Sequence, residues 1–128
     1  MIRLIDAAVL VAAAAVLLTV VWSRFSGDKP AQAAELAKQP GTFVLDVRTQ
    51  GEYAQGHLER SVLIPVQQLA GRLSDLPADK STPILVYCAM GGRSAVAAGL
   101  LKSKGYANVH DLSGGIGAWQ RAGLPVVK

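Results

Sequence analysis

The hydrophobic pattern near the start of the chain differs from the pattern of the rest. Residues 7–22 carry no charged side chain, and Thr19 is their only clearly polar residue. A helix that is apolar on every face suits a lipid environment, and residues 2–22 reach the ~20 residues that span a bilayer core. The pattern therefore predicts one transmembrane helix with a short linker over residues 1–30, followed by a single domain over residues 31–128.

Short apolar runs alternate with helical patterns throughout residues 31–128. Four runs are predicted as strands, at residues 42–47, 61–65, 83–87 and 109–112. Segments with helical spacing or helical turns separate them, at residues 31–38, 48–57, 66–76, 94–101 and 116–122. The first strand shows no apolar–polar alternation, which is typical of a parallel sheet covered on both faces. Alternating strands and helices predict an α/β domain on an open parallel sheet.

The apolar segment has two possible fates. A cleaved signal peptide needs a small-residue site close behind its apolar stretch, whereas Ala31-Gln32-Ala33 lies well beyond it, after Pro30. We therefore expect a retained single-pass anchor through residues 2–22.

The orientation of this anchor follows from the lysines and arginines around it. Arg3 lies before the span, whereas Arg24, Lys29 and Lys38 lie after it. The positive-inside rule then favours a bacterial inner-membrane protein whose domain faces the cytoplasm. A short basic segment before a long apolar run also begins many exported domains, so the periplasmic side stays open.

Charge and cysteine content exclude several classes of function. The net charge is +4, and the basic residues are scattered without a basic run or interleaved aromatic residues, so we expect no nucleic-acid partner. A single cysteine excludes an internal disulfide and a multi-cysteine zinc site. Neither of the two histidines has a metal-ligand partner at helical spacing, so we expect no metal site.

That single cysteine, Cys88, lies where the strand at 83–87 ends and the helix at 94–101 begins. Loop amides and the unpaired N–H groups of a helix start converge at such a junction and can hold an anion. A thiol placed there ionises more easily than a free one. Cysteine can also be a small buried hydrophobe beside a plain turn, but the Cys-x-x-Gly-x-Arg spacing favours chemistry.

The residues after the cysteine fit this hypothesis. Gly91 and Gly92 allow the loop to take positive φ values, and Arg93 adds a cation that we expect to lower the pKa of the thiol further. Residues 88–93 resemble the active-site loop of rhodanese-type sulfurtransferases. Cysteine phosphatases have Cys-x5-Arg, whereas this loop has Cys-x4-Arg, so it favours a sulfane sulfur over a tetrahedral phosphate.

Two further stretches resemble signatures of rhodanese domains. The first contains Asp46-Val47-Arg48, Glu52-Tyr53 and Gly56-His57, and the second contains Leu112-Ser113-Gly114-Gly115, Trp119 and residues 122–126. The resemblance implies an open parallel five-stranded sheet flanked by helices, with the cysteine loop at the carboxyl ends of the strands. The sequence departs from the family pattern at Arg60, where a glycine is usual, and at Leu63, where an asparagine is usual.

The resemblance implies a sulfurtransferase that moves sulfane sulfur from a donor such as thiosulfate to cyanide or a thiol through a persulfide on Cys88. Its substrate-binding residues would be the six that follow, Ala89, Met90, Gly91, Gly92, Arg93 and Ser94. No cofactor is implied, and the partners would be small sulfur donors and acceptors or a protein persulfide. The alternative is a membrane-tethered binding or persulfide-carrier module with little turnover.

We expect structural roles for the other candidate residues. Asp46 should cap a backbone turn, and Arg48 should pair with Glu52 four residues later. Transfer through an ionised thiolate needs no general base, so His57 is assigned a structural role. Trp119 is expected in the core.

Overall fold

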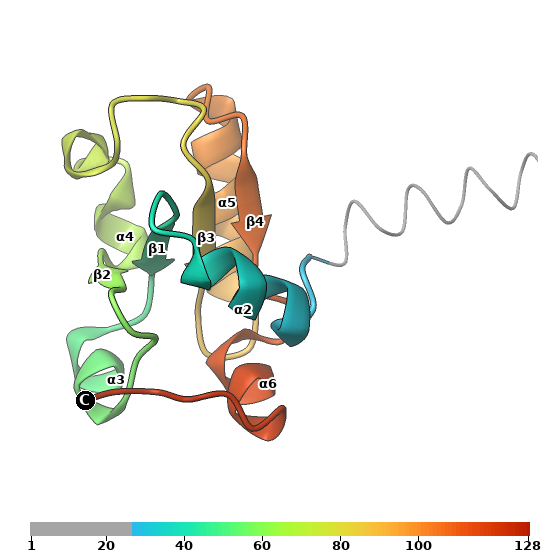
Figure 1. Ribbon diagram of the computed structural model, residues 1–128. Helices are drawn as coiled ribbons and strands as arrows, with labels where there is room; N and C mark the ends of the chain where they lie inside the picture. The colour runs from blue at the N-terminus through green and yellow to red at the C-terminus, as the bar shows by residue number, and fades with distance from the viewer. Residues whose placement is uncertain (1–26) are drawn as a thin grey trace, which may run out of the picture.

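The computed structural model describes residues 27–128, which form a parallel sheet with helices on both faces (Figure 1). The elements in chain order are α2 (Pro30–Lys38), β1 (Phe43–Asp46), α3 (Gln50–Gln55), β2 (Val62–Leu63), α4 (Val66–Leu69), the 3-10 helix η1 (Leu73–Asp75), β3 (Ile84–Tyr87), α5 (Gly92–Ser103), β4 (Val109–Asp111) and α6 (Gly115–Arg121). The strands lie in the order β2-β1-β3-β4, and every neighbouring pair is parallel. The predicted α/β class is confirmed.

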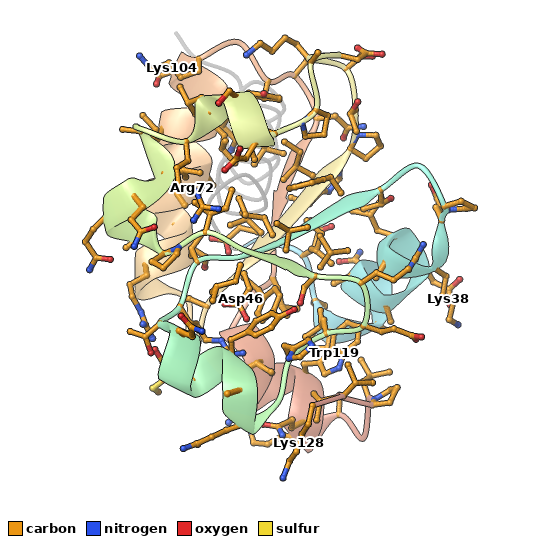
Figure 2. All side chains as sticks on the ribbon, turned by 90° about the vertical axis from the view of Figure 1, so that its left-hand side faces the viewer. Lys38, Asp46, Arg72, Lys104, Trp119 and Lys128 are labelled. Atoms are coloured by element: carbon orange, nitrogen blue, oxygen red, sulfur yellow. The ribbon has the colours of Figure 1, made fainter. Side chains whose placement is uncertain are left out.

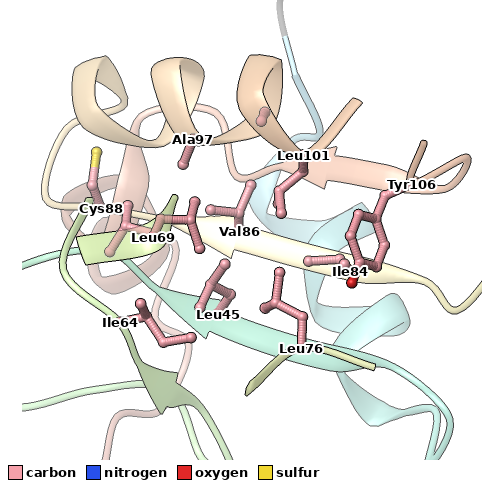
Figure 3. Packing of buried hydrophobic residues seen from close by; sticks show 12 residues of the cluster. Leu45, Ile64, Leu69, Leu76, Ile84, Val86, Cys88, Ala97, Leu101 and Tyr106 are labelled. Atoms are coloured by element: carbon pink, nitrogen blue, oxygen red, sulfur yellow. The ribbon is translucent and has the colours of Figure 1, made fainter. Parts of the chain in front are cut away.

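The central strand β3 shows why the strands lack apolar–polar alternation. Ile84 and Val86 contribute to a cluster with residues of α4 and α5 on one face (Figure 3), while Leu85 and Tyr87 contribute to a second cluster with α2 and α6 on the other. All four side chains are fully buried. Helices therefore cover both faces, and both sets of alternate positions must be apolar.

The predicted helix at residues 66–76 is wrong in its length. Helix α4 ends at Leu69, and η1 forms a separate turn. Gly71, a weak helix former, donates its N–H to the carbonyl of Gln68 at 3.1 Å and closes a tight turn instead of continuing the helix. Leu69 and Leu76 are nevertheless both buried, so the apolar stripe is real although two elements carry it.

The five-stranded sheet implied by the resemblance also differs from the structure. Among residues 27–128 the sheet has four strands, and a fifth position beside β4 is marked only by a single parallel bridge between Asp28 and Leu112. The Asp28 N–H donates to the Asp111 carbonyl at 2.7 Å, and the Ser113 N–H donates to the Asp28 carbonyl at 2.8 Å. Pro30 then begins α2, because proline lacks the N–H that a longer ladder needs and fits the first turn of a helix.

Arg60, where the resemblance leads us to expect glycine, has a left-handed backbone conformation. Its φ is +64°, the only positive φ of a non-glycine residue between residues 27 and 128. Its guanidinium donates to the carbonyl of Ala37 near the end of α2, where a cation interacts favourably with the helix dipole. A turn with a positive φ therefore forms here with arginine in place of the expected glycine.

The predicted membrane span at residues 2–22 lies outside the described residues. Within residues 27–128, no helix has both the length and the apolar character needed to cross a bilayer.

The strand order places a topological switch point at the carboxyl ends of β1 and β3. The chain leaves β1 toward β2 on one side of the sheet and leaves β3 toward β4 on the other, so the two connections diverge. Ligands of open α/β sheets bind at this kind of switch point. In Figure 1 these strand ends face α3 and α6, and Figure 2 shows Asp46, the last residue of β1, in that half of the molecule, away from Lys104.

Candidate active site

Cys88 directly follows β3 and lies on the same face as Ile84 and Val86. Its side chain is 1% exposed and packs in the cluster that contains Leu69 and Ala97 (Figure 3). A buried thiol in a purely apolar surrounding would resist ionisation. The polar groups at its sulfur therefore decide its chemistry.

Two residues of the following turn contact the sulfur. The Gly91 N–H donates to Cys88 Sγ at 3.0 Å, and Ser94 Oγ lies 3.4 Å from Sγ as the acceptor of the thiol proton. The Ser94 hydroxyl in turn donates to the Gly91 carbonyl at 3.2 Å, and the Ser94 side chain is fully buried. When the thiol is ionised, the Ser94 hydroxyl can instead donate to the thiolate.

The start of helix α5 supplies further donors. The helix begins at Gly92, and its N-cap residue Gly91 has no side chain that could cap it. Gly91 has a φ of +117°, as predicted, whereas the same prediction for Gly92 is wrong because Gly92 is the first helical residue. The sulfur of Cys88 instead takes the position of a capping oxygen, near the N–H groups of Gly91 and Ser94 at the helix start.

These contacts set the ionisation of Cys88. Burial by itself raises the pKa of the thiol. The Ser94 hydroxyl and the backbone N–H groups of Ser94, Gly91 and Met90 outweigh burial, so the pKa of Cys88 lies below its ordinary value. The groups around the sulfur thus favour the thiolate more than burial alone would allow.

Helix α6 binds the backbone carbonyls of the cysteine loop. The Ile116 N–H donates to the Cys88 carbonyl at 2.9 Å, and the Gly117 N–H donates to the Ala89 carbonyl at 3.1 Å. A Cβ on Gly115, whose φ is +64°, would lie 2.5 Å from both of these carbonyl oxygens. The loop carbonyls therefore face α6, which leaves the amide N–H groups free to face the sulfur.

The six predicted substrate-binding residues take different positions. Gly91 and Ser94 contact the sulfur directly, and the backbone N–H of Met90 helps to lower the pKa of the thiol. The Met90 side chain is 82% exposed at the tip of the loop. The Ala89 carbonyl accepts the N–H of Gly117 in α6, and Gly92 is the first residue of α5.

Arg93, the last of the six predicted substrate-binding residues to be placed, pairs with Glu52 of α3. Its two terminal nitrogens donate to the two carboxylate oxygens of Glu52 at 2.7 and 2.9 Å. The prediction that Arg48 pairs with Glu52 is therefore wrong. Arg48 precedes α3, so four-residue helical spacing does not apply to it, and it pairs with Asp46 at 2.8 Å in a buried position.

Other structural predictions agree with the structure. Asp46 Oδ1 accepts the N–H of Arg48 at 2.9 Å and so caps the turn after β1. The His57 ring stacks on Tyr53 with ring centres 3.6 Å apart, and its Nδ1 lies 2.9 Å from the Tyr53 carbonyl. Trp119 is 5% exposed and donates its indole N–H to the Pro125 carbonyl at 2.8 Å.

Sequence reasoning missed Asp111 at the end of β4. Its Oδ1 is buried and has no hydrogen-bond partner within residues 27–128. Burial raises the pKa of Asp111, and the nearby Ser94 hydroxyl partly opposes this effect. Its position opposite the first turn of α5 arises from the pairing of β4 with β3, for which the sequence offers no local signal.

Fold and site together define a class of protein: an open parallel α/β domain with a nucleophilic cysteine at its switch point, held by the amides of a helix start. The family model for the rhodanese-like domain matches residues 29–122. The chain belongs to the rhodanese-like domain family.

Known proteins agree with this assignment. A protein named sulfurtransferase from Allochromatium vinosum is 36% identical over 100 residues, which cover 78% of this chain and 92% of that protein. The thiosulfate sulfurtransferase GlpE of Pseudomonas putida is 33% identical over 98 residues, covering 77% of this chain and 87% of its own. The crystal structure of a rhodanese-related protein from Thermoplasma volcanium superposes with a TM-score of 0.71 at 34% identity, covering 80% of this chain and 98% of that one.

Proposed function

We propose that this protein is a sulfurtransferase that carries sulfane sulfur as a persulfide on Cys88. The observation that carries the proposal is the position of the buried Cys88 thiol at the switch point of the sheet, where its sulfur accepts the Gly91 N–H at 3.0 Å and its pKa is lowered. The sulfurtransferase names of the Allochromatium vinosum and Pseudomonas putida relatives support it.

The reaction has two displacement steps. In the first, the Cys88 thiolate attacks the outer sulfur of the donor; a new S–S bond forms on Sγ, the bond in the donor breaks, and its electron pair leaves with the remaining group, which is sulfite when thiosulfate is the donor. In the second, a thiophilic acceptor such as cyanide or a thiolate takes the outer sulfur and returns Cys88 as thiolate. This is covalent catalysis by an activated nucleophile.

The loop residues have distinct roles in this proposal. The N–H groups of Met90, Gly91 and Ser94 stabilise negative charge on Sγ, and after loading they hold the persulfide. Because α6 binds the loop carbonyls, these donors are already oriented before the donor arrives. Arg93 stands at the rim of the loop, where its guanidinium is paired with the Glu52 carboxylate.

Intact-mass spectrometry of the full chain tests the proposal. After reduction and incubation with thiosulfate, the protein should gain the mass of one sulfur atom and lose it on treatment with cyanide, with thiocyanate as product. The Cys88→Ser variant should gain nothing. An unchanged mass with both thiosulfate and a small persulfide donor, or a gain that persists in Cys88→Ser, would overturn the proposal.

A second candidate function is a persulfide carrier with little turnover of its own. The pairing of Arg93 with Glu52 favours it, because the cation at the loop is already bound to a carboxylate. A carrier would load one sulfur on Cys88 from a protein or small persulfide and pass it on, but would turn over thiosulfate slowly. Steady-state thiocyanate formation, compared with single-turnover loading, separates the two functions.

From the sequence we further propose that residues 2–22 anchor the chain in a bacterial inner membrane, with the domain on the cytoplasmic side. The span length and the excess of Lys and Arg after it support this. Alkaline phosphatase fused after Lys128 should be inactive, since it folds only outside the cytoplasm. An active fusion would place the domain in the periplasm, and a chain shortened at its amino end would show a cleaved signal instead.

A further inference from the structure

Glu52 is held in a fixed position above the cysteine loop. It lies in the first turn of α3, where its Oε1 accepts the N–H of Thr49 at 3.2 Å and the Thr49 hydroxyl at 3.1 Å. The same carboxylate binds both terminal nitrogens of Arg93. Glu52 thus occupies the planar fork of the guanidinium, the geometry in which arginine otherwise binds an oxyanion.

The electrostatics of this pair leave little positive charge for a donor. The hydrogen bonds from Arg93 lower the pKa of Glu52 to about 2, so the carboxylate is ionised at neutral pH. The guanidinium and the carboxylate therefore cancel each other. Arg48, which follows β1 at the same end of the sheet, is matched in the same way by Asp46.

A cavity of about 240 Å³ beside the pair likewise has no excess of positive charge in its lining. It borders the cysteine loop through Ile116, whose N–H binds the Cys88 carbonyl. Its lining consists of Arg48, Glu52, Gln55, Gly56, Ile116 and Gln120. The charged side chains in this lining are the two that already have partners, so the cavity is polar without an excess of positive charge.

From these contacts we propose that Glu52 determines donor specificity by occupying the Arg93 fork, so that the site disfavours dianionic oxyanion donors such as thiosulfate and prefers persulfides. This inference rests on the proposed sulfur transfer through Cys88. A thiosulfate dianion must displace Glu52 from Arg93 or approach it as a like charge, and both reduce binding. In a small persulfide such as glutathione persulfide, no sulfonate adjoins the outer sulfur, and the carboxylates lie many bonds away from it, so they need not approach the Arg93 fork.

Donor kinetics of the full chain test the inference, with cyanide as acceptor and with thiosulfate and glutathione persulfide as alternative donors. Glu52→Gln keeps the shape of the side chain but removes its charge, and it should lower the KM for thiosulfate by about tenfold. Its KM for glutathione persulfide should stay within about twofold of the wild-type value. Glu59→Gln removes the same charge from an exposed loop position and should change neither constant.

A second variant, Arg93→Gln, should change the KM for thiosulfate in the opposite direction. Arg93→Gln leaves the Glu52 carboxylate without its partner and should raise the KM for thiosulfate much more than that for glutathione persulfide. The ratio of the KM values for the two donors would not change through a general loss of folding.

Two negative results can be told apart. Normal loading of Cys88 with an unchanged KM ratio in Glu52→Gln and Arg93→Gln overturns the role of Glu52 and leaves the proposed transfer standing. Failure of the wild-type protein to load sulfur from either donor overturns the proposed transfer, and the specificity inference with it.

Discussion

The sulfur of Cys88 caps the start of helix α5, as the side-chain oxygen of a serine or aspartate caps many other helices. The N–H groups of Gly91 and Ser94 face it, and no side chain of the N-cap residue competes. Each donor favours the thiolate over the thiol, and the thiolate in return satisfies donors that the helix leaves unpaired. Reactivity of the cysteine and stability of the helix start therefore depend on the same contacts.

This coupling predicts the effect of Ser94→Ala. Loss of the hydroxyl removes one donor to the thiolate, so the pKa of Cys88 rises and sulfur loading at neutral pH slows by about tenfold, the equivalent of one hydrogen bond to a charged group. The rate of alkylation by iodoacetamide as a function of pH measures the pKa. Ser103→Ala is the matched control, because its hydroxyl donates to the Leu100 carbonyl at the far end of the same helix. Equal alkylation midpoints in Ser94→Ala and wild type would contradict the assignment.

A buried charge gives a second prediction for a single residue. Asp46 is fully buried, and the Arg48 side chain that it binds is 6% exposed. Asp46→Asn leaves the guanidinium charge without its counterion, which should lower the free energy of unfolding by about 3 kcal/mol. Asp75→Asn breaks the exposed pair with Arg72 and should cost less than about 1 kcal/mol. Urea unfolding measures both, and similar losses in the two variants would contradict the prediction.

At the scale of elements, local signals predicted where helices and strands lie better than where they end. Residues 66–76 have a helical stripe, yet the chain divides it into α4 and η1 at Gly71. The sheet edge beside β4 likewise depends on how far the chain around Asp28 runs before Pro30 turns it into α2. Such ends are decided by packing and by single residues that interrupt a ladder or a helix.

The contact between α6 and the cysteine loop predicts unequal effects of two glycine substitutions. Gly115→Ala places a Cβ 2.5 Å from backbone oxygens of Cys88 and Ala89, at a φ that alanine resists. The free energy of unfolding should fall by more than about 2 kcal/mol, and sulfur loading should slow because the loop must move. Gly99→Ala, at an exposed position in α5 with nothing within 4 Å, should stabilise the protein by up to about 1 kcal/mol. Equal effects on unfolding in the two variants would argue against the close contact.

For the molecule as a whole, the Glu52–Arg93 pair predicts a dependence of stability on acid. The pKa of Glu52 is lowered from 4.5 to about 2 in the folded state. A carboxyl group whose pKa is lowered by folding stabilises the fold above its unfolded pKa, and this contribution is lost as the pH falls from 4.5 toward 2. Both side chains are about one-third exposed, so screening keeps the contribution below about 1 kcal/mol.

Urea unfolding at a series of pH values measures this effect. Wild type should be more stable than Glu52→Gln at neutral pH, and the difference should vanish near pH 2. Glu59→Gln controls for the change in net charge. A difference between wild type and Glu52→Gln that stays constant down to pH 2 would show that the pair does not link α3 to α5 in this way.

The candidate site divides into parts that the sequence predicts and parts that it does not. The junction of strand, cysteine, glycine and helix is local, so residues 88–94 alone indicated the ring of amides around Cys88. The pairing of Arg93 with Glu52 joins residues 41 positions apart, and the neighbouring Arg48 offered a plausible wrong partner. Only the packing of α3 beside the start of α5 selects between them. Asp111 likewise comes near Ser94 through strand pairing, which the apolar pattern does not specify.

The dependence of the cysteine loop on α6 also sets an order of events during synthesis. Cys88 leaves the ribosome before Ile116 and Gly117, whose N–H groups bind the carbonyls of Cys88 and Ala89. Trp119, which anchors α6 through the Pro125 carbonyl, comes later still. Until that segment docks, the carbonyls of Cys88 and Ala89 lack the N–H groups that bind them in the folded protein, so the loop is fixed in place only when the closing contacts of the fold form.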